Sequence, residues 1–256
     1  DAGRVPAVGL DRARLDLTDA AAVAAALDAY APACVVNAGA YTQVDRAEAE
    51  PAAADAGNRI GPAILAAACG RRGIPLVHVS TDYVFDGSGG RPWRPQDPTG
   101  PLGVYGASKL AGERAILDSG CTAAIVRTGW LFAPWGQNFL TTMLRLGRER
   151  SALGVVDDQW GGPTPAERLA RALLAAAREV RPGIYHFGGW PAVTWCGFAR
   201  AIFAAAEAET GQRPPTVEAI PTSAYPTRAT RPAFSVLDSS GFAATYGIPA
   251  PDWRVG

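Results

Sequence analysis

The sequence predicts an α/β fold, a doubly wound and mostly parallel sheet of Rossmann-like type with a smaller C-terminal lobe. Two observations carry this prediction. Short apolar runs bounded by turn residues alternate with helical stretches in the first half of the chain, and the alternation loosens after about residue 130. Strands that alternate with helices imply crossover connections, which place parallel strands in one sheet covered on both faces.

Three apolar runs are expected to form the central strands. They span residues 33–38, 75–80 and 123–128, and each is mainly apolar on both faces, as a buried parallel strand requires. Residues 5–10 predict one more strand ahead of them.

Helices are expected between these strands, over residues 19–30, 58–72 and 105–118. Thr18 is a candidate N-cap for the first helix. The second ends in two arginines and Gly73, which suit a helix C-terminus. The later elements are expected as helices near 138–149, 165–179 and 195–210, and as strands near 153–156, 184–187 and 216–220.

Charge and cysteine content exclude several classes of protein. Lys plus Arg and Asp plus Glu both number 24, so no bulk positive charge favours nucleic acid. No apolar run reaches the length of a membrane span. The four cysteines lack metal-ligand spacing, which predicts reduced thiols in a cytoplasmic protein. They are Cys34, Cys69, Cys121 and Cys196.

Tyr105 and Lys109 are the strongest local signal for chemistry. They lie four residues apart near the start of a predicted helix and therefore share one face. Lys109 is the one lysine among 24 basic residues, and a guanidinium does not replace a compact ammonium. An ammonium close to a phenol lowers the phenol pKa, so that the phenol can exchange a proton with a carbonyl oxygen.

Two further segments follow the ends of predicted strands, where doubly wound sheets bind ligands. Residues 80–87 supply hydroxyl groups and an Asp-Gly turn, and residues 37–42 supply small side chains that let a ligand approach the backbone. Each segment alone is also compatible with ordinary turn chemistry. The two histidines, His78 and His186, lie in strand-like runs and are expected to be satisfied interior residues.

Together these segments resemble the dTDP-4-dehydrorhamnose reductase family, a branch of the extended short-chain dehydrogenases/reductases. The likeness extends over nearly the whole chain. Its most specific parts are Ser-Thr-Asp-Tyr-Val-Phe at 80–85 and Asp-Gln-Trp-Gly-Gly-Pro-Thr at 158–164. The other matching segments are 36–48, 105–113, 127–130, 137–139 and 231–235.

The resemblance implies reduction of the 4-keto group of dTDP-4-dehydro-L-rhamnose to dTDP-L-rhamnose. It assigns proton donation to Tyr105, the ribose hydroxyls and the phenol pKa to Lys109, and orientation of the keto group to Thr81. It also implies a dinucleotide-binding core over residues 1–130 and a mainly substrate-binding lobe over 131–256, interleaved with the core. The substrate residues implied are Thr81, Asp82, Tyr83, Trp130, Asn138 and Arg231; for Arg231, a diphosphate contact and a solvated surface arginine are both open.

The cofactor implied is NADPH, with NADH as the alternative. Arg12 and Arg14 could hold a 2′-phosphate, whereas Asp11 could hold the ribose hydroxyls of NADH. Some relatives use magnesium, but no carboxylate cluster in this sequence assigns a site to it. The cofactor residues implied are Asp11, Asp16, Leu17, Asn37, Ala38, Gly39, Tyr41, Tyr105 and Lys109.

One departure from the family pattern concerns the N-terminus. The chain begins with Asp1, and no glycine-rich dinucleotide fingerprint precedes Asn37. Residues 4–10 resemble the family's second strand, so we expect the first strand, its glycine loop and most of the following helix to be missing, with a further cut after Gly256. We expect the intact protein to bind the dinucleotide and this chain to bind it weakly, so that this chain by itself could be inactive.

Three alternatives stay open at this stage. The substrate could be another nucleotide-linked 4-keto-deoxysugar, or the chain could be a catalytically silent regulatory subunit of the same fold. The third is a sugar-nucleotide 4,6-dehydratase or epimerase on the same fold; Tyr83 follows Thr81-Asp82 where dehydratases carry an acid, which counts against dehydration. The partners expected are a nucleotide-sugar substrate and a second copy in a homodimer, with neither nucleic acid nor membrane.

Overall fold

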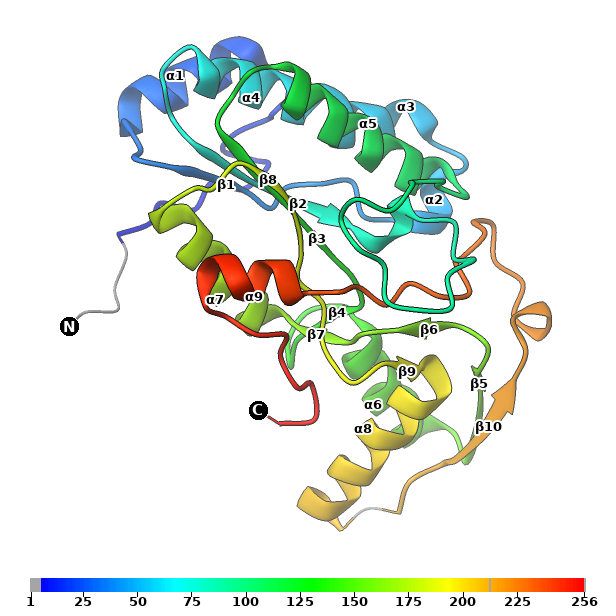
Figure 1. Cartoon of the computed structure of the whole chain (residues 1–256). Helices are drawn as coiled ribbons and strands as arrows, with labels where there is room; N and C mark the ends of the chain where they lie inside the picture. The colour runs from blue at the N-terminus through cyan, green and yellow to red at the C-terminus, as the bar shows by residue number, and fades with distance from the viewer. Residues whose placement is uncertain (1–5, 212, 256) are drawn as a thin grey trace.

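The computed structural model describes residues 6–211 and 213–255, and its centre is a parallel sheet of four strands (Figure 1). In space the strands follow the order β1-β2-β3-β8. The doubly wound α/β class predicted from the sequence is confirmed. The strands are β1 (Val35–Asn37), β2 (Leu76–Thr81), β3 (Ala123–Thr128) and β8 (Gly183–His186).

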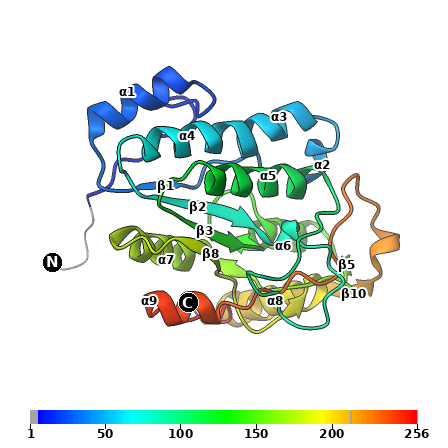
Figure 2. The ribbon, with the colours of Figure 1, turned by 45° about the horizontal axis from the view of Figure 1, so that its top comes forward.

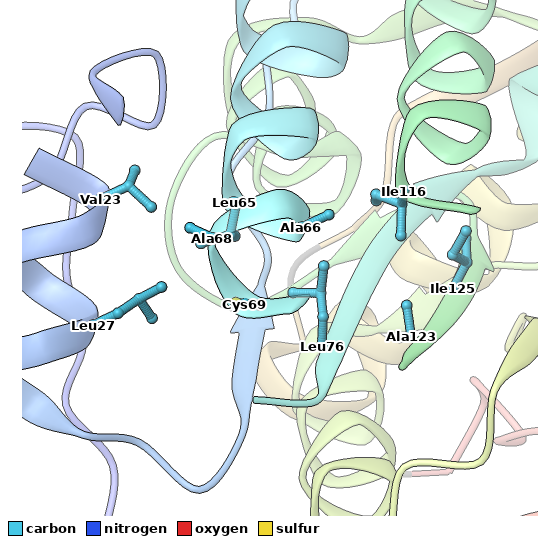
Figure 3. Packing of buried hydrophobic residues seen from close by; sticks show 10 residues of the cluster. All are labelled: Val23, Leu27, Leu65, Ala66, Ala68, Cys69, Leu76, Ile116, Ala123 and Ile125. Atoms are coloured by element: carbon cyan, nitrogen blue, oxygen red, sulfur yellow. The ribbon is translucent and has the colours of Figure 1, made fainter. Parts of the chain in front are cut away.

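Helices cover both faces of this sheet (Figure 2). On one face lie α1 (Ala20–Tyr30), α4 (Gly61–Gly70) and α5 (Val104–Asp118). Their apolar side chains meet those of β2 and β3 in a buried cluster, which includes Leu65, Leu76 and Ile125 (Figure 3). On the other face, α7 (Ala166–Arg178) and α9 (Ser240–Tyr246) pack around Val77, Val126 and Phe242.

The expected N-cap of the first helix is wrong by one residue. Asp19 caps α1, because its carboxylate accepts hydrogen bonds from the backbone N–H groups of Ala21 and Ala22 at 2.9 and 3.0 Å. The Thr18 hydroxyl instead donates to Asp16 in the preceding turn, at 2.7 Å. A carboxylate also interacts more favourably with the helix dipole than a hydroxyl does.

The strand expected over residues 5–10 does not form in its described part. Residues 6–10 have no strand hydrogen bonding, and residue 5 lies outside the described residues. A strand needs a neighbour to pair with, and within the described chain β1 pairs only with β2. Val8 accordingly stays 63% exposed.

The helix expected over 58–72 is longer and irregular. It begins with α3 (Pro51–Asp55), continues through a π-helical turn (Ala56–Ile60) and runs into α4. This π-helical turn directs the Asn58 side chain inward, where its amide donates a hydrogen bond to the Ser108 hydroxyl of α5 at 3.0 Å. A Cβ at Gly112 would stand 2.0 Å from the Asn58 carbonyl oxygen, so α5 needs glycine there to pack this closely.

The second half forms a smaller layer below the sheet. Helices α6 (Phe139–Glu149) and α8 (Trp195–Thr210) pack on a parallel pair, β5 (Ala152–Val156) and β10 (Thr216–Ile220). Strand β8 returns to the main sheet, so the two halves of the chain interleave. The remaining short elements are α2 (Val44–Ala47), β4 (Leu131–Phe132), β6 (Trp160–Gly161), β7 (Thr164–Pro165), β9 (Val193–Thr194) and two 3₁₀ turns, η2 (Asp82–Val84) and η3 (Thr222–Ala224).

Candidate active site

The predicted catalytic residues come together where β2 ends and α5 begins. Thr81 is the last residue of β2, and Tyr105 lies in the first turn of α5, hydrogen-bonded to the Thr81 hydroxyl. The ring of Tyr83 meets that of Tyr105 edge-on, with centroids 5.6 Å apart. Gly106 allows this contact between the two elements, because a Cβ there would stand 2.2 Å from the Tyr83 carbonyl oxygen.

Lys109 lies one turn further along α5 and is buried, with 2% of its surface exposed. Its Nζ donates a hydrogen bond to the Val79 carbonyl at 2.6 Å and lies 3.4 Å from Nε2 of His78. Burial lowers the pKa of Lys109 to about 8, although the charge of Glu113 acts in the opposite direction. The ammonium of Lys109 therefore loses its proton more readily than that of an exposed lysine.

The expected lowering of the Tyr105 pKa is wrong for this structure. Burial raises the pKa of the phenol to about 12, and the nearby Asp82 carboxylate adds to the rise, while the bond with Thr81 opposes it. The Lys109 amine points at the Val79 carbonyl of β2 and does not offset this burial. Tyr105 is consequently protonated at neutral pH, as a proton donor must be.

Asp82 lies beneath Thr81, in the interior of the protein. Its Oδ1 accepts a hydrogen bond from the Thr81 hydroxyl at 3.0 Å. A Cβ at Gly129 would stand 2.4 Å from this carboxylate. Burial raises the pKa of Asp82 to about 6, while the side chains of Ser235 and Thr81 act to lower the pKa of the carboxyl. Because Asp82 is buried and accepts a hydrogen bond from the Thr81 hydroxyl, it can affect the orientation of that hydroxyl.

A buried ion pair that was not predicted from the sequence joins β3 to α5. Arg127 of β3 donates two hydrogen bonds to Glu113 of α5, at 2.9 and 2.7 Å, and both side chains are at most 2% exposed. Ser80 donates a third bond to Glu113 at 2.5 Å. The available signal was an arginine within the otherwise apolar run 123–128.

Three of the predicted cofactor residues, Asn37, Ala38 and Gly39, lie at the carboxyl end of β1 and directly after it. Ala38 and Gly39 are exposed there, and the side chain of Leu17 would lie 3.6 Å from a Cβ at Gly39. The Tyr41 hydroxyl donates to Glu50 at 2.9 Å. Asp11 and Asp16 are exposed and accept bonds within their own turns, from the N–H groups of Arg14 and Thr18.

A nicotinamide dinucleotide fits this donor set. The small residues at 38–40 leave their backbone open to a ligand. A protonated Lys109 has three N–H donors, of which Val79 takes one, so a ribose hydroxyl can be held by another. The described residues include no group of three or more His, Cys, Asp or Glu side chains that could hold a metal.

Trp130 and Asn138, two of the predicted substrate residues, belong to the second half of the chain. Trp130 has a φ of 50° and stacks on Trp195. The Asn138 amide is engaged in capping α6, since it accepts from the Thr141 N–H at 3.2 Å and donates to two backbone carbonyls. Its side chain has little capacity left for a sugar.

Arg231 is not a solvated surface residue. It forms a bidentate ion pair with Asp45 of α2, at 2.7 and 3.2 Å. This ion pair joins the loop around residue 231 to α2. The positive charge of Arg231 also interacts electrostatically with the Tyr83 side chain. Asp45 was not predicted as a partner.

The fold and site define a class. A parallel sheet with Thr81, Tyr105 and Lys109 clustered at the carboxyl end of β2 is the arrangement of a short-chain dehydrogenase/reductase. No helix in the described part of the chain is long and apolar enough to cross a membrane.

Comparison with known proteins narrows this class to one family. The family model described as RmlD substrate binding domain matches residues 2–256. The dTDP-4-dehydrorhamnose reductase of Aggregatibacter actinomycetemcomitans is 43% identical over 261 residues, 99% of this chain and 89% of the relative. That of Burkholderia thailandensis is 45% identical over 259 residues, 96% and 87% of the two chains.

A solved structure agrees with both relatives. The crystal structure of the Bacillus anthracis dTDP-4-dehydrorhamnose reductase in complex with NADP has a TM-score of 0.90 at 33% identity, and the match covers 96% of this chain and 85% of that one. The chain belongs to the dTDP-4-dehydrorhamnose reductase family. The resemblance inferred from the sequence is confirmed.

Proposed function

We propose that this protein reduces the 4-keto group of dTDP-4-dehydro-L-rhamnose to a hydroxyl, with NADPH as the reductant. The observation that carries this proposal is the intact cluster of Thr81, Tyr105 and Lys109, built at the carboxyl end of the sheet in a chain of this family. The same cluster favours an enzyme over a silent regulatory subunit. Another nucleotide-linked 4-keto-deoxysugar remains the alternative substrate.

Bound NADPH would supply the hydride that adds to the carbonyl carbon. The chain's own residues handle the oxygen. The Thr81 hydroxyl orients the keto group, and Tyr105, protonated because burial raises its pKa to about 12, gives its proton to the oxygen as negative charge develops there. Lys109, in its protonated form, holds the ribose hydroxyls of the cofactor.

For cofactor choice we propose NADPH over NADH. Arg12 and Arg14 are exposed beside Asp11, and guanidinium groups suit a 2′-phosphate. The NADP bound by the Bacillus anthracis relative agrees with this choice. For the substrate, we propose that Tyr83 and Trp130 line the sugar pocket and that Arg231 contacts the diphosphate while it stays anchored by Asp45.

We also propose a cytoplasmic enzyme that can pair as a homodimer. The four cysteines are free, which agrees with a reducing compartment. Neither nucleic acid nor membrane belongs to the proposed partners.

The decisive experiment follows NADPH absorbance with dTDP-4-dehydro-L-rhamnose and compares Tyr105→Phe with the unaltered chain. We expect kcat to fall by about 10²–10⁴, with NADPH binding near normal. The matched control is Tyr246→Phe, because that hydroxyl bonds to the backbone of Arg181. A Tyr105→Phe variant that turns over at the unaltered rate would contradict the assignment of the acid.

A further inference from the structure

Two buried polar side chains, Asn37 and His78, connect the cofactor loop to Lys109, and the mechanism above gives His78 no part. His78 of β2 lies opposite Asn37 in the pairing of β1 with β2. His78, Asn37 and Lys109 are 0%, 4% and 2% exposed. Buried polar groups this close must match donors to acceptors, because an unmatched group is costly.

The tautomer of His78 follows from its neighbour Asn37. The Gly39 N–H donates to Oδ1 of Asn37 at 3.1 Å, so the amide nitrogen faces Nδ1 of His78, also at 3.1 Å. An amide nitrogen only donates, and therefore Nδ1 must accept. Burial and the charge of Lys109 hold the pKa of His78 well below its usual value. The neutral ring thus carries its one proton on Nε2.

That Nε2–H faces the amine of Lys109, with 3.4 Å between the two nitrogens. A protonated ammonium has only donors, so the charged lysine sets donor against donor in this contact. A neutral amine has a lone pair that accepts from Nε2–H while it still donates to the Val79 carbonyl. The imidazole therefore favours the neutral amine.

The other ionisable groups around Lys109 do not prevent His78 from favouring the neutral amine. Glu113, on the same helix, favours the ammonium, but Arg127 of β3 already pairs with its carboxylate. Tyr105, also on α5, is neutral, and the charge of Asp82 from η2 acts on Tyr105. Of these groups, His78 alone has a polar atom within 3.4 Å of Nζ.

We propose that His78 is a positioning residue that destabilises the ammonium of Lys109 relative to the neutral amine, through an Nε2–H tautomer set by Asn37 and the Gly39 N–H. Its functional meaning rests on the proposed role of Lys109. The device joins the backbone of the cofactor loop to the amine, so a ligand that moves the loop also changes the protonation of the lysine.

The side chain of Lys109 can be observed selectively, because it is the one lysine in the chain. Lysine labelled with ¹³C at Cε gives a single side-chain NMR signal, and its titration reports Lys109 alone. Two variants test the two ring nitrogens of His78 separately. His78→Asn keeps an acceptor for Asn37 but does not reach Lys109, whereas His78→Gln places an amide oxygen where Nε2 stood.

We expect the titration midpoint of Lys109 to rise by about one pH unit in His78→Asn and at least as much in His78→Gln. The control is His186→Asn, which removes the other buried histidine and should leave the midpoint unchanged. A midpoint that stays put or falls in both His78 variants overturns the proposal. This readout needs no turnover, so it is independent of the substrate assignment.

A second measurement uses the unaltered protein and does not depend on the variants folding. ¹⁵N chemical shifts of the two histidines report their tautomers. We expect Nε2–H for His78 and Nδ1–H for His186, whose Nδ1 lies 2.9 Å from the Trp93 carbonyl. Asn37→Asp, which can only accept, should turn His78 into the Nδ1–H form. An Nδ1–H tautomer of His78 in the unaltered protein overturns the proposal.

Discussion

Replacement of Glu113 by Gln removes the negative charge from an ion pair that lies wholly inside the molecule. Glu113 and Arg127 are 1% and 2% exposed, and the carboxylate accepts three hydrogen bonds, two from Arg127 and one from Ser80. Without the carboxylate, the guanidinium is a buried charge with no counter-charge, which costs about 3–5 kcal/mol. For a chain of this size, that corresponds to a melting temperature lower by roughly 6–20 °C.

The assay is urea unfolding followed by circular dichroism, with a control pair on the surface. Glu167 and Arg171 lie 2.6 Å apart but are 64% and 65% exposed, so Glu167→Gln should change the free energy of unfolding by less than about 1 kcal/mol. The double variant Glu113→Gln, Arg127→Met should cost less than the sum of its single changes, because it removes the stranded charge. Equal losses for Glu113→Gln and Glu167→Gln would refute the reasoning.

Three further predictions concern packing, acidity and substrate binding. Gly112→Ala should cost at least about 2 kcal/mol in urea unfolding, since its Cβ would stand 2.0 Å from a carbonyl oxygen; Gly241→Ala, with nothing within 4 Å, should cost nothing. The pKa of Asp82 is raised from 3.8 to about 6, so its folded state favours the protonated form. The unfolding free energy should therefore fall relative to Asp82→Asn, by about 3 kcal/mol in total as the pH rises from about 3 to about 7, and a flat difference would contradict the burial of this carboxyl. Arg231→Ala should raise KM for the nucleotide sugar about tenfold, whereas Asp45→Asn, which leaves the guanidinium in place, should raise it less; equal KM values for Arg231→Ala and the unaltered chain would exclude the diphosphate contact.

The alternation of strands and helices could be predicted because it depends on local periodicity. The runs at 75–80 and 123–128 became β2 and β3 within one residue. The run at 5–10 failed because a strand also needs a pairing neighbour, which local composition does not report. The π-helical turn at Ala56–Ile60 was missed for a related reason, since it serves the packing of Asn58 against α5.

The sequence by itself determined the chemistry that is available: a tyrosine and a lone lysine one helical turn apart, and a threonine at the end of an apolar strand. These relations are local, because the geometry of one helix and one strand decides them. Only the tertiary structure decided the protonation of these groups. The Tyr105 phenol is raised to a pKa of about 12 by the elements that enclose it, and Lys109 meets a histidine 31 residues away that in turn meets Asn37 at a separation of 41. Such contacts depend on the register of β1 with β2 and on the docking of α5, and no spacing along the chain encodes either.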